Sequence, residues 1–153
     1  MPVTLAQERS ALRDLFIRER IANSFAAQGL MATIGARLAR VEEGEVHIEL
    51  PFSMTLSQQR GYLHAGATTS IVDSACGYAA LTRAPAGFDV VTAEFKLNLL
   101  RPALGQRFLA VGRVVSAGRL LTVCTGEVRA FADGGEGYKV VALMQATIVN
   151  VAE

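Results

Sequence analysis

The chain has 153 residues, with 15 basic and 14 acidic side chains and a formal net charge of +1, and this length is typical of a single domain. Such a balance gives no bulk electrostatic argument for binding nucleic acid or an anionic membrane. Apolar residues make up 51% of the chain, yet no apolar run approaches the roughly 20 residues of a membrane span. The apolar excess therefore favours an interface between subunits.

The first predicted element is a helix over residues 5–26, with Gly29 as its stop. Its apolar residues fall roughly on one side, and they are Leu5, Leu12, Leu15, Phe16, Ile21 and Phe25. Two strands are predicted at 31–41 and 45–50. In the second strand apolar and polar residues alternate, so His47 is expected to be exposed.

A polar loop at 51–61 leads into a second helix, predicted over 66–83 and ended by the Ala-Pro-Ala-Gly sequence at 84–87. Small side chains dominate this helix and would let a curved sheet approach it closely: Ala67, Ser70, Ser74, Ala75, Cys76, Gly77, Ala79 and Ala80. Four strands complete the chain, at 91–99, 108–116, 120–130 and 139–149. Their connections are rich in turn residues, which favours antiparallel pairing.

The order of helix, two strands, helix and four strands indicates an α+β fold in which the sheet wraps the central helix. The clearest strand is 91–99, where apolar residues alternate strictly with Thr92, Glu94, Lys96 and Asn98. The simplest interpretation of these polar residues is a solvated face. Because an open polar face is unusual on a central strand, the alternative is that a ligand or a second subunit covers it.

Asp73 is the single charged side chain between Leu63 and Thr82 when His64 is neutral. Its neighbours are small or apolar, as in a helix that is buried. A lone buried charge costs several kcal/mol or shifts its pKa unless another group pairs with it. Asp73 is therefore a candidate functional carboxylate. The alternative is a structural carboxylate that caps a loop or pairs with an arginine.

Two cysteines, Cys76 and Cys124, are too few for a disulfide framework or a zinc site. Cys76 lies near Asp73, but apart from His64 no histidine is close in sequence to activate it. Both cysteines are therefore predicted to be core residues. The amino terminus has no signal-peptide pattern, and Glu8 and Asp14 are unlike a transit peptide. These features predict a cytoplasmic protein without a bound metal.

Three features together resemble the PaaI-like (phenylacetate-pathway) family of hotdog-fold thioesterases. They are the sequence Gly61-Tyr-Leu-His-Ala-Gly66 followed by Asp73, the strand from Val91 that ends in Leu100-Arg101-Pro102, and Gly118-Arg119 at the next turn. The resemblance covers roughly residues 30–150. It implies a hotdog domain over 30–153, with a long central helix wrapped by a curved antiparallel sheet, and an extra helical segment over 1–29.

Members of that family hydrolyse acyl-coenzyme A thioesters without a metal or other cofactor, at sites formed between two subunits. The resemblance implies that Asp73 is the catalytic carboxylate, either as a base that activates water or as a nucleophile. Gln58 would position the water or the thioester carbonyl, and Thr92 would help to hold the water. Ala65 and Gly66 would present backbone N–H groups to the thioester oxygen, although the family often has glycine where this chain has Ala65.

His64 is expected to orient the start of the helix, with its imidazole holding the loop that carries Gln58. The spacing favours Gln58 over its neighbour Gln59 as the inward amide. Coenzyme A would pass along the two turns that the resemblance identifies, and the residues there are Leu100, Arg101, Pro102, Gly118 and Arg119. An alternative is that both arginines are turn charges without a task.

The resemblance also implies a homodimer built by continuing the sheet, commonly paired into a homotetramer, with no nucleic-acid or membrane partner. The substrate would be an acyl- or aroyl-coenzyme A, and the acyl pocket would be lined by whichever of Leu56, Tyr62, Tyr78, Leu81 and Phe88 face it. One alternative is a non-catalytic module that binds acyl-coenzyme A. Such regulators usually carry a DNA-binding segment, and residues 1–29 are too short and too balanced in charge to supply one. Another is a hotdog hydratase, which uses a histidine with an acid placed differently.

Overall fold

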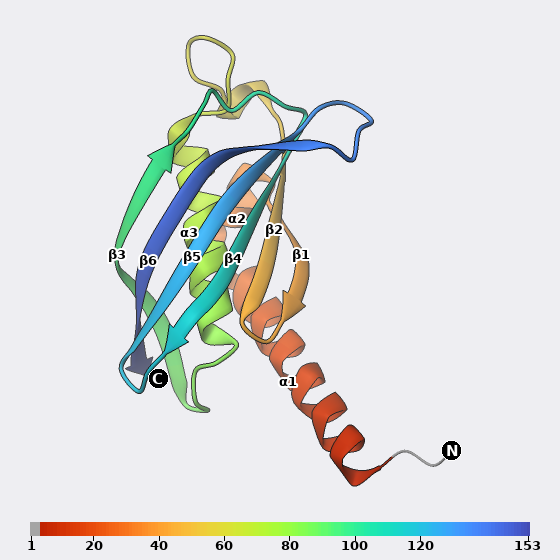
Figure 1. The fold of residues 1–153 in the computed structure, drawn as a ribbon, viewed down its shortest axis with the longest axis vertical. Helices are drawn as coiled ribbons and strands as arrows, with labels where there is room; N and C mark the ends of the chain where they lie inside the picture. Colours follow the sequence, from red (N-terminus) through yellow and green to blue (C-terminus); the bar gives the residue numbers. More distant parts are fainter. Residues whose placement is uncertain (1–3) are drawn as a thin grey trace.

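A six-stranded antiparallel sheet wraps around the central helix α3 (Ala65–Leu81) in a computed structural model that describes residues 4–153 (Figure 1). The strands are β1 (Arg37–Glu42), β2 (Glu45–Pro51), β3 (Phe88–Leu99), β4 (Arg107–Ala117), β5 (Leu121–Phe131) and β6 (Tyr138–Ala152). Their spatial order is β1-β2-β4-β5-β6-β3. The α+β class and the antiparallel sheet around a central helix are therefore confirmed.

Two helices and a single 3-10 turn complete the described residues: α1 (Leu5–Ala27), α2 (Gly29–Ile34) and η1 (Met54–Leu56). The predicted start of the first strand at residue 31 is wrong, because residues 29–34 form α2. Gly35 ends α2 in the left-handed region at φ 77°, which favours glycine. Of the predicted helical segment 1–29, the first three residues lie outside the described part.

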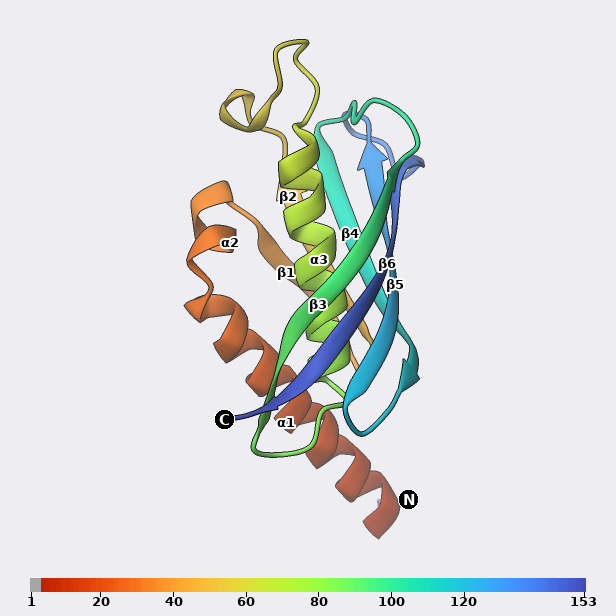
Figure 2. The ribbon, with the colours of Figure 1, turned by 90° about the vertical axis from the view of Figure 1, so that its left-hand side faces the viewer.

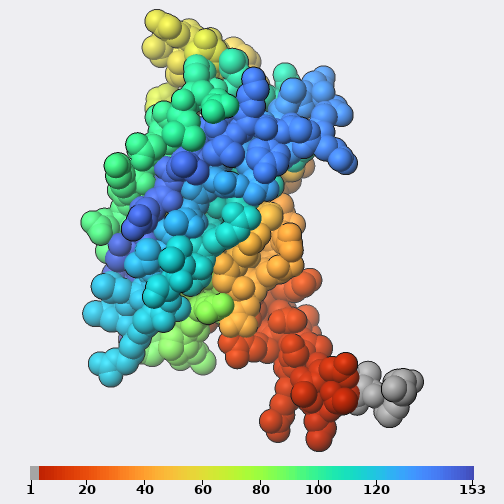
Figure 3. Space-filling view, viewed as in Figure 1, coloured from red at the N-terminus to blue at the C-terminus, as the bar shows by residue number. Residues whose placement is uncertain are grey.

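Helix α1 packs against the body of the protein through its C-terminal half. Ile17 and Ile21 are buried there, and the Arg20 guanidinium donates to the carbonyl oxygens of Ala84, at 3.2 Å, and Phe88. The N-terminal half projects away from the body (Figures 2 and 3). Four residues of the predicted apolar side are consequently exposed, namely Leu5, Leu12, Leu15 and Phe16. None of the described helices is both long and apolar enough to cross a membrane.

Helix α3 lies directly on two glycines of the sheet, Gly112 on β4 and Gly126 on β5, which are paired with each other. A methyl group at Gly126 would come within 2.5 Å of Val72 Cγ2 and 2.8 Å of Cys76 Sγ. At Gly112 it would overlap the backbone of Ala75. The small residues of α3 and these two glycines together allow the close helix–sheet contact.

We expect Gly112→Ala to lower the free energy of unfolding by about 3 kcal/mol, because the added methyl group meets helix backbone that cannot rotate away. Urea denaturation of the variant measures this change. Gly29→Ala is the matched control, since a methyl group there meets nothing within 4 Å. Equal stability of Gly112→Ala and the wild type would contradict the packing described here.

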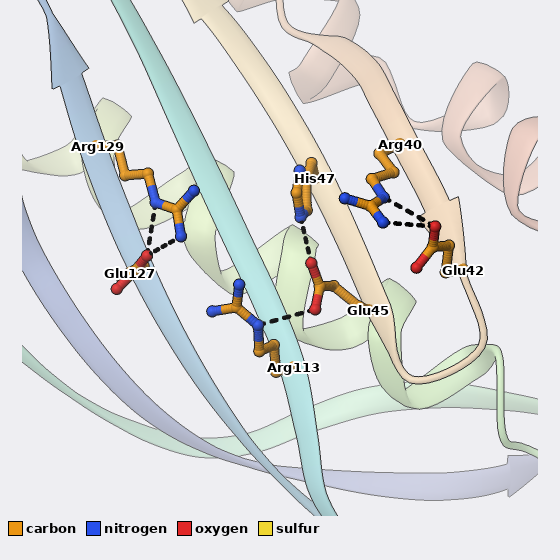
Figure 4. A network of polar contacts seen from close by, with 7 residues as sticks. All are labelled: Arg40, Glu42, Glu45, His47, Arg113, Glu127 and Arg129. Atoms are coloured by element: carbon orange, nitrogen blue, oxygen red, sulfur yellow. Dashed lines mark hydrogen bonds and ion pairs between the residues drawn. The ribbon is translucent and has the colours of Figure 1, made fainter. Parts of the chain in front are cut away.

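His47 is buried, with 8% of its surface exposed, so the prediction that it is exposed is wrong. It lies between Arg40 of β1 and Val111 of β4 on the face of the sheet away from α3 (Figure 4). Its Nε2 lies 2.6 Å from Glu45 Oε1, and the other carboxylate oxygen of Glu45 accepts from Arg113 Nε at 2.8 Å. Long charged side chains from neighbouring strands can cover such a residue, and the pattern of one strand does not reveal them.

The Glu45 carboxylate lies in a row of ion pairs on this face, together with Arg40–Glu42 and Arg129–Glu127 (Figure 4). Burial raises the pKa of Glu45, but the hydrogen bonds from His47 and Arg113 outweigh it and hold the pKa below its ordinary value. Glu45 is therefore ionised at neutral pH and belongs to the structure of the sheet.

Both cysteines are buried free thiols, as predicted. The Cys124 thiol donates to the carbonyl oxygen of Cys76 at 3.4 Å. Burial raises the pKa of both thiols, that of Cys124 to about 12. Neither is a thiolate at neutral pH, so neither has the character of a nucleophile.

Candidate active site

Asp73 projects from the middle of α3 toward the sheet and is half-buried. Its Oδ1 accepts a hydrogen bond of 2.9 Å from Thr92 Oγ1 on β3. Burial raises the pKa of the Asp73 carboxyl, and the Thr92 hydrogen bond opposes that rise in part. Among the described residues no arginine, lysine or histidine forms an ion pair with Asp73. The structural alternative of an ion pair with an arginine is therefore not realised within the described chain.

A β-bulge turns Thr92 toward Asp73. The register of β3 against β6 shifts at Ala93, so that Thr92 is opposite Ile148 but Glu94 is opposite Thr147. Glu94 accepts a hydrogen bond from Thr147, whereas Thr92 bonds to Asp73 on the helix side. Residues two apart normally share a face, and a bulge re-aims them. The predicted strict alternation of 91–99 is therefore broken at this point.

Strand β3 is an edge strand, although the sequence predicted a central one. It pairs with β6 on one side, and within the described residues no strand pairs with its other side. Large apolar side chains along this strand are exposed, namely Val91, Phe95 and Leu99. An exposed apolar edge of this length invites pairing with another chain.

Asp73 lines a cavity of about 300 Å³, here called the Asp73 cavity, between the end of α1, helix α3 and the start of β3. Besides Thr92 its walls include Ser24, Gln28, Ser74, Tyr78, Leu81 and Asp89. Two of the candidate acyl-pocket residues, Tyr78 and Leu81, are thus next to Asp73. The contribution of α1 is a feature that the sequence did not predict.

Gln58 and Ala65 line a second cavity of about 490 Å³, here called the Gln58 cavity. The chain turn predicted to meet coenzyme A closes it from the other side, with Leu100, Arg101 and Pro102. Tyr62 also lines it, whereas Leu56 and Phe88 line neither of the two cavities. Gln58 is partly buried here and Gln59 is exposed, and the Gln58 Oε1 accepts the N–H of Arg60 within the same loop.

The start of α3 leaves one backbone donor without a partner. His64 is the N-cap residue, and its Nδ1 accepts the N–H of Gly66 at 2.8 Å. The imidazole thus caps the helix instead of holding the Gln58 loop, which is closed by its own hydrogen bond from Gln58 N–H to the carbonyl of Tyr62. The N–H of Ala65 has no acceptor among the described residues. It is the available donor at the positive end of the helix.

The carboxylate and the free N–H lie in different cavities of one chain. Asp73 and Ala65 are eight residues apart on α3, which is about 12 Å along the helix axis. Gly118 and Arg119 lie at the β4–β5 turn, at the opposite end of the sheet from the turn after β3 (Figure 1). One chain therefore brings Asp73 to Thr92, and Gln58 to Ala65 and Arg101, but does not join these two groups.

Each group has a definite chemical capacity. A half-buried carboxylate with a raised pKa and one hydroxyl donor can take a proton from water or attack a carbonyl carbon. A free N–H at a helix start can stabilise negative charge on a carbonyl oxygen. Together these are the parts of a hydrolase for carboxylic acid derivatives.

Known proteins identify the class. Residues 60–136 match the family model described as "Thioesterase superfamily". A Saccharolobus solfataricus protein named "Putative esterase SSO2140" is 31% identical over 115 residues, which cover 75% of this chain and 81% of that protein. The chain therefore belongs to the thioesterase superfamily, and its general activity is that of a thioester hydrolase.

Solved structures agree with this assignment. A thioesterase family protein from Silicibacter pomeroyi has 42% identity and a TM-score of 0.86, and the match covers 90% of this chain and 99% of that one. The Escherichia coli PaaI protein from the phenylacetic acid degradation operon has 17% identity and a TM-score of 0.80. This match covers 91% of this chain and 96% of the PaaI chain. That second likeness shows the fold alone. The predicted hotdog fold is confirmed.

Proposed function

We propose that the protein hydrolyses an acyl-coenzyme A thioester to the free acid and coenzyme A, with Asp73 as the catalytic carboxylate. The observation that carries the proposal is the Asp73–Thr92 pair at the wall of a cavity, in a chain of the thioesterase superfamily. Family membership supplies the thioester, and the burial of Asp73 supplies a carboxylate that is a stronger base than an exposed one.

Asp73 can act in either of two ways. As a base, it takes a proton from a water molecule while the water oxygen bonds to the thioester carbon, and the thiolate then leaves with the C–S electron pair. As a nucleophile, its oxygen displaces the thiolate and forms a mixed anhydride, which water then hydrolyses. In both cases the carbonyl oxygen becomes negative, and the Ala65 N–H would stabilise that charge.

We further propose that two chains build each site. Within one chain Asp73 and Ala65 line separate cavities. A twofold axis at the free edge of β3 would place a second copy beside this edge, with its own β3 running in the opposite direction. Asp73 and Thr92 of one chain would then lie opposite Gln58 and Ala65 of the other. Exposed Val91, Phe95 and Leu99 would be covered in the same step.

The same reversal supports a path for coenzyme A. The β4–β5 turn of one chain, with Gly118 and Arg119, would approach the end of the partner that carries Arg101. Arginines from both chains would then be available to coenzyme A phosphates. The pairing of dimers into a tetramer and the cytoplasmic location stay predictions. Light scattering can test the assembly.

A thiol-release assay with coenzyme A thioesters from acetyl to long-chain and aromatic tests the activity. We expect free thiol to appear with at least one member of this series. Binding without thiol release would favour the non-catalytic module instead and contradict the proposal. A hydratase is disfavoured because the His64 ring accepts the Gly66 N–H at the helix start.

We expect Thr92→Val to shift the acid limb of the pH–rate profile to higher pH. The Thr92 hydroxyl stabilises the ionised form of Asp73, so its loss raises the pKa of Asp73 further, and the base is protonated at a higher pH. The pH dependence of kcat/KM measures the shift. Thr125→Val, at an exposed position of β5 outside the Asp73 cavity, is the matched control. An acid limb that stays in place would contradict the role of Thr92.

A further inference from the structure

The junction of α1 and α2 builds a polar wall of the Asp73 cavity through Gln28. This residue is both the C-cap of α1 and the N-cap of α2. Its Nε2 donates to Tyr78 Oη at 3.1 Å, and its Oε1 accepts from Ser74 Oγ at 3.0 Å. The amide therefore fixes two side chains of α3 that line the same cavity as Asp73.

The hydroxyl of Tyr78 has a proton without an acceptor. Only 6% of the Tyr78 surface is exposed. Its oxygen accepts from Gln28 Nε2 and, at 3.5 Å, from Ser24 Oγ, and no acceptor for its own proton is found among the described residues. An acceptor within reach of this proton would add a hydrogen bond. Since Tyr78 lines the cavity, an acceptor on a bound ligand would satisfy it.

Charge and size restrict that ligand. Two carboxylates, Asp73 and Asp89, line the cavity, and no lysine or arginine is found among its described lining residues. These two carboxylates of one chain's half of the site would repel an anionic acyl group, which favours a neutral oxygen as the acceptor. The volume of about 300 Å³ is at the lower end of small-molecule sites, and it fits a short acyl group.

We propose that Tyr78, held by Gln28, is a specificity-determining residue that donates to a neutral acceptor oxygen on a short acyl chain. The preferred substrates are thus coenzyme A thioesters of short oxo- or hydroxyacyl acids. Unsubstituted and carboxylate-bearing chains of the same length are poorer substrates. This inference rests on the proposed thioesterase function and names its substrate class.

The test compares kcat/KM for hexanoyl-coenzyme A, its 4-oxo and 5-oxo derivatives, and hexanedioyl-coenzyme A. In the wild type we expect one of the oxo derivatives to be preferred over hexanoyl by about tenfold, as one hydrogen bond allows, and hexanedioyl to be the poorest. Tyr78→Phe keeps the ring that packs against Phe25 but removes the donor. We expect this variant to have a ratio of kcat/KM for the preferred oxo derivative to kcat/KM for hexanoyl-coenzyme A that is close to one.

Tyr138→Phe is the matched control, because it makes the same change at the start of β6, outside the Asp73 cavity. We expect it to keep the wild-type preference. No oxo preference in the wild type, or a preference that survives Tyr78→Phe, would overturn the inference while thioester hydrolysis itself stands. A lower Tm of Tyr78→Phe with an unchanged preference would indicate a purely structural tyrosine. Absence of hydrolysis with every thioester would instead refute the proposed function and this inference with it.

Discussion

Replacing Asp73 by asparagine is expected to reduce thioester hydrolysis by about 10³-fold while the fold is kept, because the amide can neither accept a proton from water nor attack a thioester. Asparagine has the same shape and can still accept the hydrogen bond from Thr92. Thiol release under saturating substrate measures the loss in kcat, and circular dichroism checks the fold.

The stability of Asp73→Asn gives a second readout. Since burial raises the pKa of Asp73 in the folded protein, ionisation of this group costs stability at pH values above its unfolded pKa. A neutral asparagine removes that cost, so the Tm at neutral pH should stay the same or rise. Asp14→Asn, on the exposed part of α1, is the control for the charge change. Thiol release by Asp73→Asn at the wild-type rate would exclude the proposed mechanism.

Mixed dimers of Asp73→Asn and Gln58→Ala chains are expected to regain about half of the wild-type activity, although each variant alone is nearly inactive. If each site takes Asp73 from one chain and Gln58 from the other, one site of the mixed dimer carries both changes and the other site carries neither. Co-expression with two different affinity tags isolates the mixed dimer. Its thiol-release rate is then compared with that of the wild type.

The reciprocal mixture sharpens this experiment. A wild-type chain paired with an Asp73→Asn, Gln58→Ala double variant has one change in each shared site, so this dimer should be nearly inactive. Sites contained within one chain would give the reverse pattern, with about half activity here and almost none in the first mixture. A monomer in solution would also contradict the shared site.

The fold could be predicted to a large extent because it depends on local patterns. The small residues of α3 between Ala67 and Ala80 indicated a helix enclosed by a sheet, and alternating apolar residues located the strands. The errors arose where contacts between distant segments decide the conformation or the burial of a residue. Residues 29–34 pack as a short helix, and His47 is covered by charged groups of neighbouring strands.

The residue types of the site were also visible in the sequence. A lone carboxylate in a helix of small residues, Asp73, and a histidine at the helix start, His64, need no tertiary information to be recognised. Tertiary information is needed, however, to know which backbone N–H group stays free. The His64 ring uses the N–H of Gly66, and this leaves the N–H of Ala65.

The sequence alone determined the fold class, the central helix and the carboxylate, since hydrophobic periodicity and side-chain size act over a few residues. The tertiary structure decided which groups meet. A bulge at Ala93, set by the pairing of β3 with β6, turns Thr92 toward Asp73 against the alternation of its own strand. The packing of α1 places Gln28 on Tyr78, from 50 residues away in the sequence. Such contacts depend on the register and packing of segments far apart in the chain, which no local pattern records.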